Sequence, residues 1–223
     1  MSNYEMKKEV VEACHVLSGM GYLAGIGGNL AIRVADRMAV TPSAADYFSM
    51  KPDDICIMDI HSLEVLEGDR SPSVESGLHA LFFRKRPEIK ASVHTHQPVA
   101  SAMALLNRNI PMLSGEEQRE LGEKVPVVGY GPSGTGMLVN ALKKKLSPHL
   151  NGYLLRNHGI ICGARSMDQA IRNVRLIEKA AARYIAEAIT SNRGSRPVAT
   201  ASLADAQAAT RKGPSRSRGG VSS

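Results

Sequence analysis

The sequence is poor in aromatic residues and in cysteine. Among 223 residues there is no tryptophan, with three phenylalanines and six tyrosines, which argues against a platform that stacks nucleic-acid bases. The three cysteines (Cys14, Cys56 and Cys162) are an odd number and lie far apart in apolar surroundings, so they predict reduced core thiols in a cytosolic protein rather than a disulfide framework. No nucleic-acid partner is expected.

Long hydrophobic runs are also absent. No apolar run approaches the ~20 residues that a membrane-spanning helix needs, and the first residues, MSNYEMKKEV, lack the apolar region of a signal peptide. The sequence therefore predicts a cytoplasmic protein that does not enter a membrane.

Positive charge is concentrated at one end of the chain. Residues 191–223 hold six Arg or Lys against one Asp, and they account for +5 of the formal net charge of +7. That segment is rich in Ser, Gly, Ala and Arg and lacks the apolar content to fold. We therefore expect one folded domain over residues 1–190 and a basic, disordered tail over residues 191–223.

Hydrophobic periodicity predicts alternating strands and helices. Apolar runs predict strands at residues 30–34, 37–41, 55–60, 65–66, 89–96, 126–130, 153–155 and 160–163. Spacings of three and four, with capping residues, predict helices at residues 3–17, between Ser73 and Pro87, at 99–106 and 138–146, and from Ser166 to Ala188. Residues 114–124 are polar and charged and are assigned no element, and residues 131–135 are a loop. This order predicts one α/β domain whose sheet is covered by helices.

His94-Thr95-His96 is the pattern that a folded core least requires. Two histidines at i and i+2 project from one face of a strand, so their rings can converge on one ion while Thr95 points away. His158 follows the run 153–155 in an Asn-His-Gly turn, where a side chain can be aimed into a cleft. Three neutral imidazoles suit zinc and leave a position open for substrate. The pattern predicts a metal site, with a solvated histidine pair as the alternative.

Other polar residues allow two interpretations. Glu75 lies near the first turn of its helix, where the macrodipole alone favours an acid by ~0.3 to 1 kcal/mol, or it acts as a base beside the metal. Residues 27–29 and 41–44 are simple turns, or they bind an anion through backbone N–H groups. The remaining histidines are assigned no role: His15, His61, His79 and His149.

Several short motifs occur in one order over residues 5–190. In chain order they are Gly28-Asn29, Thr41-Pro42-Ser43, Ser73-x-Glu75, His79, Arg86-Pro87-Glu88, Val93-His94-Thr95-His96, Leu154-Leu155-x-Asn157-His158-Gly159 and Glu178. This series resembles the class II aldolase/adducin family and is most like its L-fuculose-phosphate aldolase branch. Glu75 supports that branch, because the ribulose-phosphate epimerase branch carries Asp there.

The resemblance implies a three-layer α/β/α fold with a mainly antiparallel central sheet flanked by helices, and a homotetramer with active sites at subunit interfaces. It implies that His94, His96 and His158 hold Zn²⁺, with Mn²⁺, Fe²⁺ and Co²⁺ as alternatives, and that Glu75 is the acid/base and a fourth ligand in the free enzyme. The phosphate of a small sugar phosphate would lie among Gly28, Asn29, Ser43, Ala44 and Ser73.

By the same resemblance, the activity is retro-aldol cleavage of a ketose phosphate through a metal-stabilised enediolate, giving a dihydroxyacetone-phosphate-like product and an aldehyde. The chain departs from the family pattern at Ile26-Gly27, at Ala44 and at Val74, where the family has hydroxyl residues or glycine. The family's tyrosine acid after Ile110-Pro111 is also absent. Decarboxylation of a 3-oxo acid sugar phosphate, epimerisation and dehydration therefore stay open, and a non-catalytic adducin-like interaction module is the alternative of another class.

Overall fold

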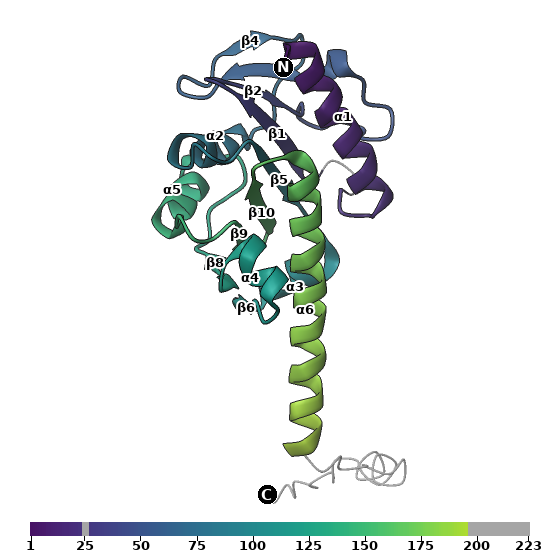
Figure 1. Cartoon of the computed structure of the whole chain (residues 1–223), viewed down its shortest axis with the longest axis vertical. Helices are drawn as coiled ribbons and strands as arrows, with labels where there is room; N and C mark the ends of the chain where they lie inside the picture. The colour runs from purple at the N-terminus through teal and green to yellow at the C-terminus, as the bar shows by residue number, and fades with distance from the viewer. Residues whose placement is uncertain (24–26, 196–223) are drawn as a thin grey trace, which may run out of the picture. The chain divides into compact units, whose positions relative to one another are not determined.

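The computed structural model describes residues 1–23 and 27–195 (Figure 1). The chain divides into two units, Met1–Ile185 and Ala186–Ser223. The first unit contains the sheet and the helices that cover it. Helix α6 continues to Ser195, and most of the predicted tail, residues 196–223, lies outside the described part of the chain.

The first unit is built on an eight-stranded sheet with the order β4-β3-β2-β1-β5-β10-β9-β8. Its strands are β1 (Asn29–Val34), β2 (Arg37–Val40), β3 (Cys56–Asp59), β4 (Val65–Glu67), β5 (Ala91–Thr95), β8 (Val127–Val128), β9 (Gly152–Leu155) and β10 (Gly159–Ala164). Among the strands of residues 1–23 and 27–195, only β8 and β9 pair in parallel, and β6 (Ile110–Pro111) with β7 (Lys124–Val125) forms a separate small ladder. A strand lies in each predicted run, although β8 is shorter than the predicted 126–130, and β6 and β7 were not predicted. The mainly antiparallel sheet is confirmed.

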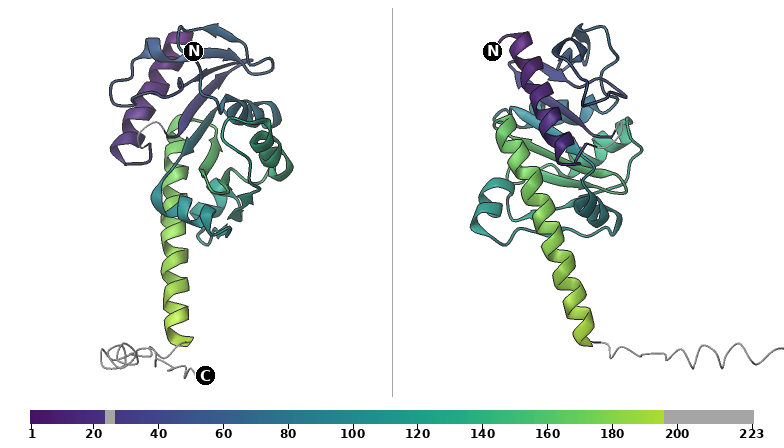
Figure 2. Two further views of the ribbon diagram at one scale, coloured as in Figure 1. Left: turned by 180° about the vertical axis from the view of Figure 1, so that it is seen from behind. Right: turned by 90° about the vertical axis from the view of Figure 1, so that its right-hand side faces the viewer.

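Helices cover both faces of this sheet (Figures 1 and 2). They are α1 (Asn3–Gly19), α2 (Ser76–Lys85), α3 (Pro98–Leu105), α4 (Gly115–Leu121), α5 (Gly136–Lys145) and α6 (Met167–Ser195), with a 3₁₀ turn, η1 (Pro52–Asp54). Successive strand residues point to opposite faces. Leu30 and Ile160 pack in a buried cluster with α1, α3 and α6, whereas Ala31 and Ile161 pack in a second cluster with α2 and α5. The result is the predicted three-layer α/β/α arrangement.

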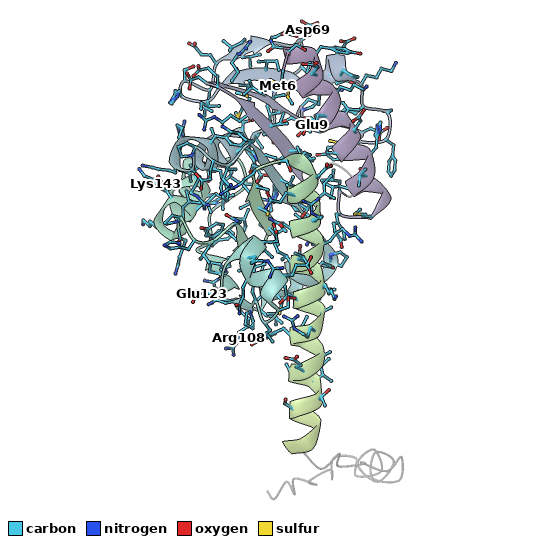
Figure 3. All side chains as sticks on the ribbon, viewed as in Figure 1. Met6, Glu9, Asp69, Arg108, Glu123 and Lys143 are labelled. Carbon is cyan, nitrogen blue, oxygen red and sulfur yellow. The ribbon has the colours of Figure 1, made fainter. Side chains whose placement is uncertain are left out.

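Polar and apolar side chains separate as expected for such layers. Met6 of α1 is buried in the core, while Arg108, Glu123 and Lys143 lie at the periphery (Figure 3). The three cysteines are buried and free, as predicted. Within the described residues, no helix is both long and apolar enough to cross a membrane.

The segment 114–124, to which the sequence assigned no element, contains helix α4. Its signal is a capping box: Ser114 Oγ accepts from the Glu117 backbone N–H at 3.1 Å, and the Glu117 carboxylate accepts from the Ser114 N–H at 3.0 Å. Glu117 is also paired with Arg183 of α6 at 2.6 Å, so a contact distant in sequence stabilises this short helix. The polar composition of the segment explains why no helix was predicted there.

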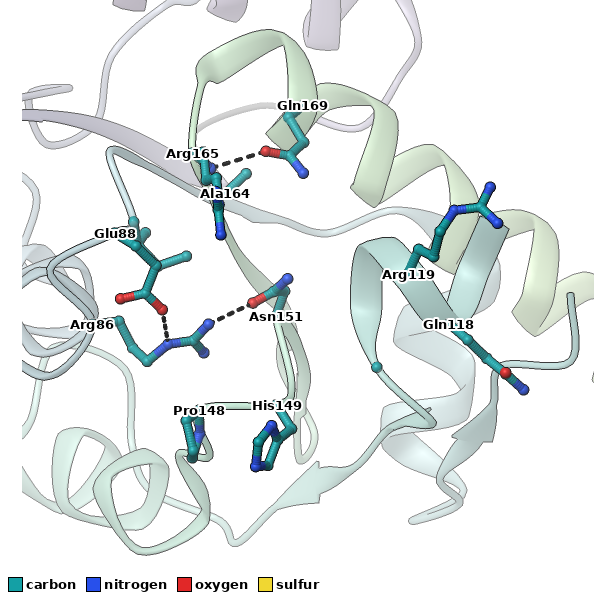
Figure 4. A pocket seen from close by; sticks show the side chains of 12 residues that line it. Arg86, Glu88, Gln118, Arg119, Pro148, His149, Asn151, Ala164, Arg165 and Gln169 are labelled. Carbon is teal, nitrogen blue, oxygen red and sulfur yellow. Dashed lines mark hydrogen bonds and ion pairs between the residues drawn. The ribbon is translucent and has the colours of Figure 1, made fainter. Parts of the chain in front are cut away.

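A cavity of about 510 Å³ opens beside Arg86, at the end of α2. The Arg86 guanidinium donates to Glu88, to Asn151 Oδ1 at 3.0 Å and to the Leu150 carbonyl at 3.0 Å, so it joins α2 to the start of β9 (Figure 4). Arg119, which also lines the cavity, extends away from Arg86 and Asn151. The cavity reaches Ala164 at the end of β10, whereas His158 precedes the start of that strand. It is therefore distinct from the histidine cluster.

Candidate metal centre

The structure brings the three predicted histidines together. His94 lies on β5, His96 follows its last residue, Thr95, and His158 lies in the turn between β9 and β10. The Nε2 atom of His94 is 2.9 Å from that of His96 and 3.2 Å from that of His158. Tetrahedral ligands about 2.0–2.1 Å from a zinc ion lie about 3.3 Å from one another. The three nitrogens are therefore spaced as ligands that share one ion.

His94 shows why these nitrogens need a cation between them. The carbonyl oxygen of Ile160 lies 2.6 Å from Nδ1 and must accept a proton from it, so the unprotonated Nε2 faces the other two rings. Burial lowers the pKa of His94 to about 3, and burial also lowers the pKa of His96. Lone pairs on neutral imidazoles repel at these distances unless a positive ion accepts them. The donor set fits a divalent metal.

The Asn-His-Gly sequence explains how His158 reaches the pair on β5. Asn157 adopts a left-handed conformation, with φ of 57°, which turns the chain sharply out of β9. A Cβ at Gly159 would lie 2.5 Å from the Thr95 carbonyl oxygen and 2.6 Å from His96 Cδ2. Only glycine lets β10 start this close to the end of β5, so Gly159 allows the preceding His158 to reach the pair on β5.

Glu75 completes the cluster. It caps α2 instead of lying in the first helical turn, and its side chain makes no capping bond. Its Oε2 is 3.2 Å from His94 Nε2, and its Oε1 is 3.3 Å from His158 Nε2. The carboxylate is only 5% exposed, and it accepts from Asn29 Nδ2 at 2.8 Å and from Ser133 Oγ at 2.8 Å. It is therefore aimed at the histidines, away from the helix backbone.

The neighbours of Glu75 keep this carboxylate ionised. Burial by itself would raise its pKa, but His94, His158 and the hydrogen bonds from Asn29 and Ser133 outweigh burial and lower the pKa to about 2. A carboxylate beside three imidazole rings gives a donor set of four groups, which suits a divalent ion.

His79, to which the sequence assigned no role, lies behind this carboxylate. It is fully buried, with Nε2 at 2.6 Å from Asn29 Oδ1 and Nδ1 at 2.8 Å from Ser92 Oγ. If His79 Nε2–H donates to Asn29 Oδ1, the Asn29 amide must present its N–H to Glu75, whereas a flipped amide would place oxygen against an ionised carboxylate. The spacing of His79 four residues after Glu75, on one helix face, is the sequence signal for this pairing.

The residues predicted to surround a phosphate come from three adjacent segments. The Ser73 N–H donates to the Thr41 carbonyl at 3.0 Å, and the Ser43 N–H donates to the Ser71 carbonyl at 2.9 Å. The buried Tyr47 hydroxyl donates to the Gly28 carbonyl and so joins residues 27–29 to the same group. The structure therefore brings the predicted segments together beside Glu75.

Several side chains of that group already have partners. Asn29 is engaged by Glu75 and His79, Ser73 Oγ accepts from the Glu75 N–H at 3.2 Å, and Ser43 Oγ donates to the Pro72 carbonyl at 3.1 Å. Ala44 is exposed with φ of 50°. Ile26 lies outside the described residues. The Ser43 hydroxyl would have to exchange its bond to donate to a phosphate, whereas the Ser73 hydroxyl can donate to a phosphate oxygen while it still accepts from Glu75.

Comparison with known proteins points in the same direction as the geometry. Residues 8–185 match the family model described as the class II aldolase and adducin N-terminal domain. A 5-deoxy-D-ribulose 1-phosphate aldolase of Bacillus thuringiensis serovar kurstaki is 34% identical over 180 residues, 80% of this chain and 83% of that protein. An L-fuculose phosphate aldolase of Methanocaldococcus jannaschii is 30% identical over 175 residues, 78% of this chain and 93% of that protein.

Two further matches concern fold and chemistry. A solved structure of an L-fuculose 1-phosphate aldolase superposes with a TM-score of 0.75 at 30% identity, covering 93% of this chain and 95% of the other. A methylthioribulose-1-phosphate dehydratase of Serratia proteamaculans is 28% identical over 190 residues, 80% of this chain and 93% of that protein. The superposition confirms the predicted fold class.

Metal binding is the first testable consequence. Protein purified without chelator should carry about one divalent ion per chain by elemental analysis, and His158→Ala should lose it because one of three nitrogens is gone. His61→Ala is the matched control, since His61 is exposed and contacts Asp36 at 3.4 Å. A metal content under about 0.2 ion per chain, together with no uptake on zinc titration, would contradict a metal site.

The second consequence concerns acid stability in the metal-free protein. Burial lowers the pKa of His79 from 6.5 to about 4, so between these values the unfolded chain binds a proton that the folded chain refuses. Stability from this group is complete above pH 6.5 and is lost as the pH falls towards 4, about 2 kcal/mol between pH 7 and 5. Urea unfolding at both pH values should show a smaller loss in His79→Gln. Equal losses in the two proteins would contradict this account.

Proposed function

The chain belongs to the class II aldolase and adducin family, with L-fuculose-phosphate aldolases among its relatives, and is a carbon–carbon lyase. On that premise, we propose that it cleaves a ketose 1-phosphate with the help of a divalent metal ion. The products would be dihydroxyacetone phosphate and an aldehyde. The observation that carries this proposal is the convergence of three imidazole nitrogens and the Glu75 carboxylate beside the segments at residues 27–29, 41–44 and 71–73.

The names of the relatives support the substrate class. Two of them are named for 5-deoxy-D-ribulose 1-phosphate and L-fuculose phosphate, which share a ketose phosphate and differ in the rest of the sugar. We assign the shared phosphate to the adjacent loops, at Gly28, Asn29, Ser43, Ala44 and Ser73. Backbone N–H groups in such loops bind phosphate oxygens without needing a charged side chain.

The ion would be held by His94, His96 and His158, with Glu75 as a further ligand when no substrate is present. A divalent ion there supplies Lewis-acid polarisation of the substrate's carbonyl and hydroxyl oxygens. We propose Zn²⁺, because three neutral imidazoles suit it, with Mn²⁺, Fe²⁺ and Co²⁺ as alternatives.

Glu75 carries the proton in this proposal. Breaking the bond between C3 and C4 leaves its electron pair on the three-carbon fragment, where C3 must gain a proton. Glu75 is suited to exchange that proton, because Asn29 and Ser133 fix the orientation of its carboxylate next to the histidines.

The missing tyrosine supports dehydration and decarboxylation as second candidates. Among the described residues, no tyrosine hydroxyl is hydrogen-bonded to Glu75 or to the three histidines, and the hydroxyl of nearby Tyr47 is taken by Gly28. The dehydratase relative shows that this family includes chemistry other than aldol cleavage. A non-catalytic module is disfavoured, because a scaffold has no use for a buried chelate with a carboxylate.

Assembly and location follow from the same proposal. Large apolar side chains are exposed near residues 131–135, namely Val74, Tyr130 and Met137, and a second copy would bury such a surface. We propose a homotetramer with active sites at subunit interfaces, a domain over residues 1–190 with a basic tail, and a cytoplasmic location consistent with three free thiols.

A substrate panel tests the reaction. Purified protein with Zn²⁺ would be offered ketose 1-phosphates and 3-oxo acid sugar phosphates, with release of dihydroxyacetone phosphate, CO₂ or a dehydrated ketone recorded separately. We expect dihydroxyacetone phosphate from at least one ketose 1-phosphate. CO₂ or a dehydrated product alone would replace aldol cleavage by that reaction, and no product from any substrate would sink the proposal.

Glu75→Gln separates the base from the metal site. The amide keeps the shape of the side chain but cannot take a proton, so turnover should fall about 10²-fold to 10⁴-fold while the metal content stays at the wild-type value. Glu12→Gln is the matched control, because Glu12 is exposed and pairs with Lys8 at 3.7 Å. Unchanged turnover in Glu75→Gln would remove this carboxylate from the mechanism.

A further inference from the structure

Ser133 contacts the candidate acid/base from the solvent side. It lies in the loop between β8 and α5, 58 residues after Glu75, and its hydroxyl donates to Glu75 Oε1 at 2.8 Å. Asn29 contacts the other oxygen, Oε2, from the buried side. The carboxylate is thus held between a buried amide and an exposed hydroxyl.

The loop rests directly on the segment that carries Glu75. A Cβ at Gly134 would lie 3.0 Å from the Val74 Cβ, so the backbone next to Ser133 packs against the residue next to Glu75. Thr135 Oγ1 donates to the Pro132 carbonyl at 2.7 Å and closes the same loop without contacting the carboxylate. The position of Ser133 is therefore set by the packing of Gly134 against Val74.

The two donors to Glu75 differ in chemistry. The Asn29 amide N–H can only donate, and His79 fixes its orientation. The Ser133 hydroxyl can donate or accept, because its hydrogen rotates about the Cβ–Oγ bond. A proton on Oε2 would face an N–H group, whereas a proton on Oε1 can be donated to Ser133 Oγ while the serine hydrogen turns to solvent. The Nε2 lone pair of His94 lies 3.2 Å from Oε2 but would be engaged by the metal ion, so only Oε1 keeps a hydrogen-bond partner in both states.

We propose that Ser133 is a positioning residue that selects Oε1 of Glu75 as the oxygen through which the proton passes. In the cleavage direction, Oε1 takes the proton that the substrate's C4 hydroxyl loses as the aldehyde forms, and Ser133 changes from donor to acceptor. The Oε1–H bond then breaks as the electron pair of the broken C3–C4 bond takes that proton at C3, and Ser133 becomes a donor again. The condensation direction reverses each change, so no other reactant is needed. This inference rests on the role of Glu75 in the proposed function.

Kinetics of two variants at this position test the inference. Ser133→Ala should lower kcat about tenfold to a hundredfold, the effect of losing a hydrogen bond to a charged group, with KM changed less than about twofold. Ser133→Thr keeps the hydroxyl and should restore most of the wild-type kcat. The zinc content and the thermal midpoint should match the wild type in both variants.

Thr135→Val is the matched control, because it removes a hydroxyl from the same loop without touching Glu75. Its kcat should equal that of the wild type. If Ser133→Ala retains full kcat, or if Thr135→Val loses as much, the hydroxyl of Ser133 does not position Glu75. A wild type that turns over no substrate would overturn the proposed function instead.

Crystal structures, which need no substrate, distinguish a failure of this inference from a failure of the proposed function. Crystal structures of the zinc-loaded wild type and of Ser133→Ala should differ at the Glu75 carboxylate, which should rotate about its last side-chain bond when Oε1 loses its partner. A carboxylate in the same place in both structures would overturn the inference whatever the activity.

Discussion

The constraint on which this structure depends is the cost of burying polar groups whose lone pairs face one another. Three imidazoles and a carboxylate meet at one point, and His94 is fully buried there. Two of these groups are held by partners outside the cluster: the Ile160 carbonyl for His94, and Asn29 with Ser133 for Glu75. These outer contacts leave Nε2 of His94 and the carboxylate of Glu75 directed at the point where the four groups meet.

The central sheet supplies those partners through its register. Asn29 on β1 pairs with His94 on β5, and His94 pairs with Ile161 on β10. Paired residues point to the same face, so Asn29 and His94 lie on the side of α2, where Glu75 and His79 approach. The site is therefore a polar end of the same sheet face that elsewhere packs Ala31 and Ile161 against α2 and α5.

Local signals in the sequence predicted most of the elements, because strand runs and helix periodicity depend on near neighbours. The pair His94 and His96 and the turn at His158 were predictable for the same reason: each lies on or just beyond a strand with clear ends. Ser133 was not, since its partner is 58 residues away and a serine in a loop carries no signal. Helix α4 had a local signal, its capping box, but the polar composition of the segment obscured it. His79 had one too, its spacing of four residues from Glu75, but a lone buried histidine is usually structural.

The alternation of side chains along β5 has a further consequence for folding. A slip of one residue between β1 and β5 would turn His94 into the opposite layer and bring Val93 to the polar end of the sheet. Such a sheet could still bury apolar residues, but it could not gather three imidazoles. An ion held by the histidines would therefore stabilise the correctly paired sheet over sheets whose strands are shifted by one residue. The yield of folded protein would then depend on the metal supply.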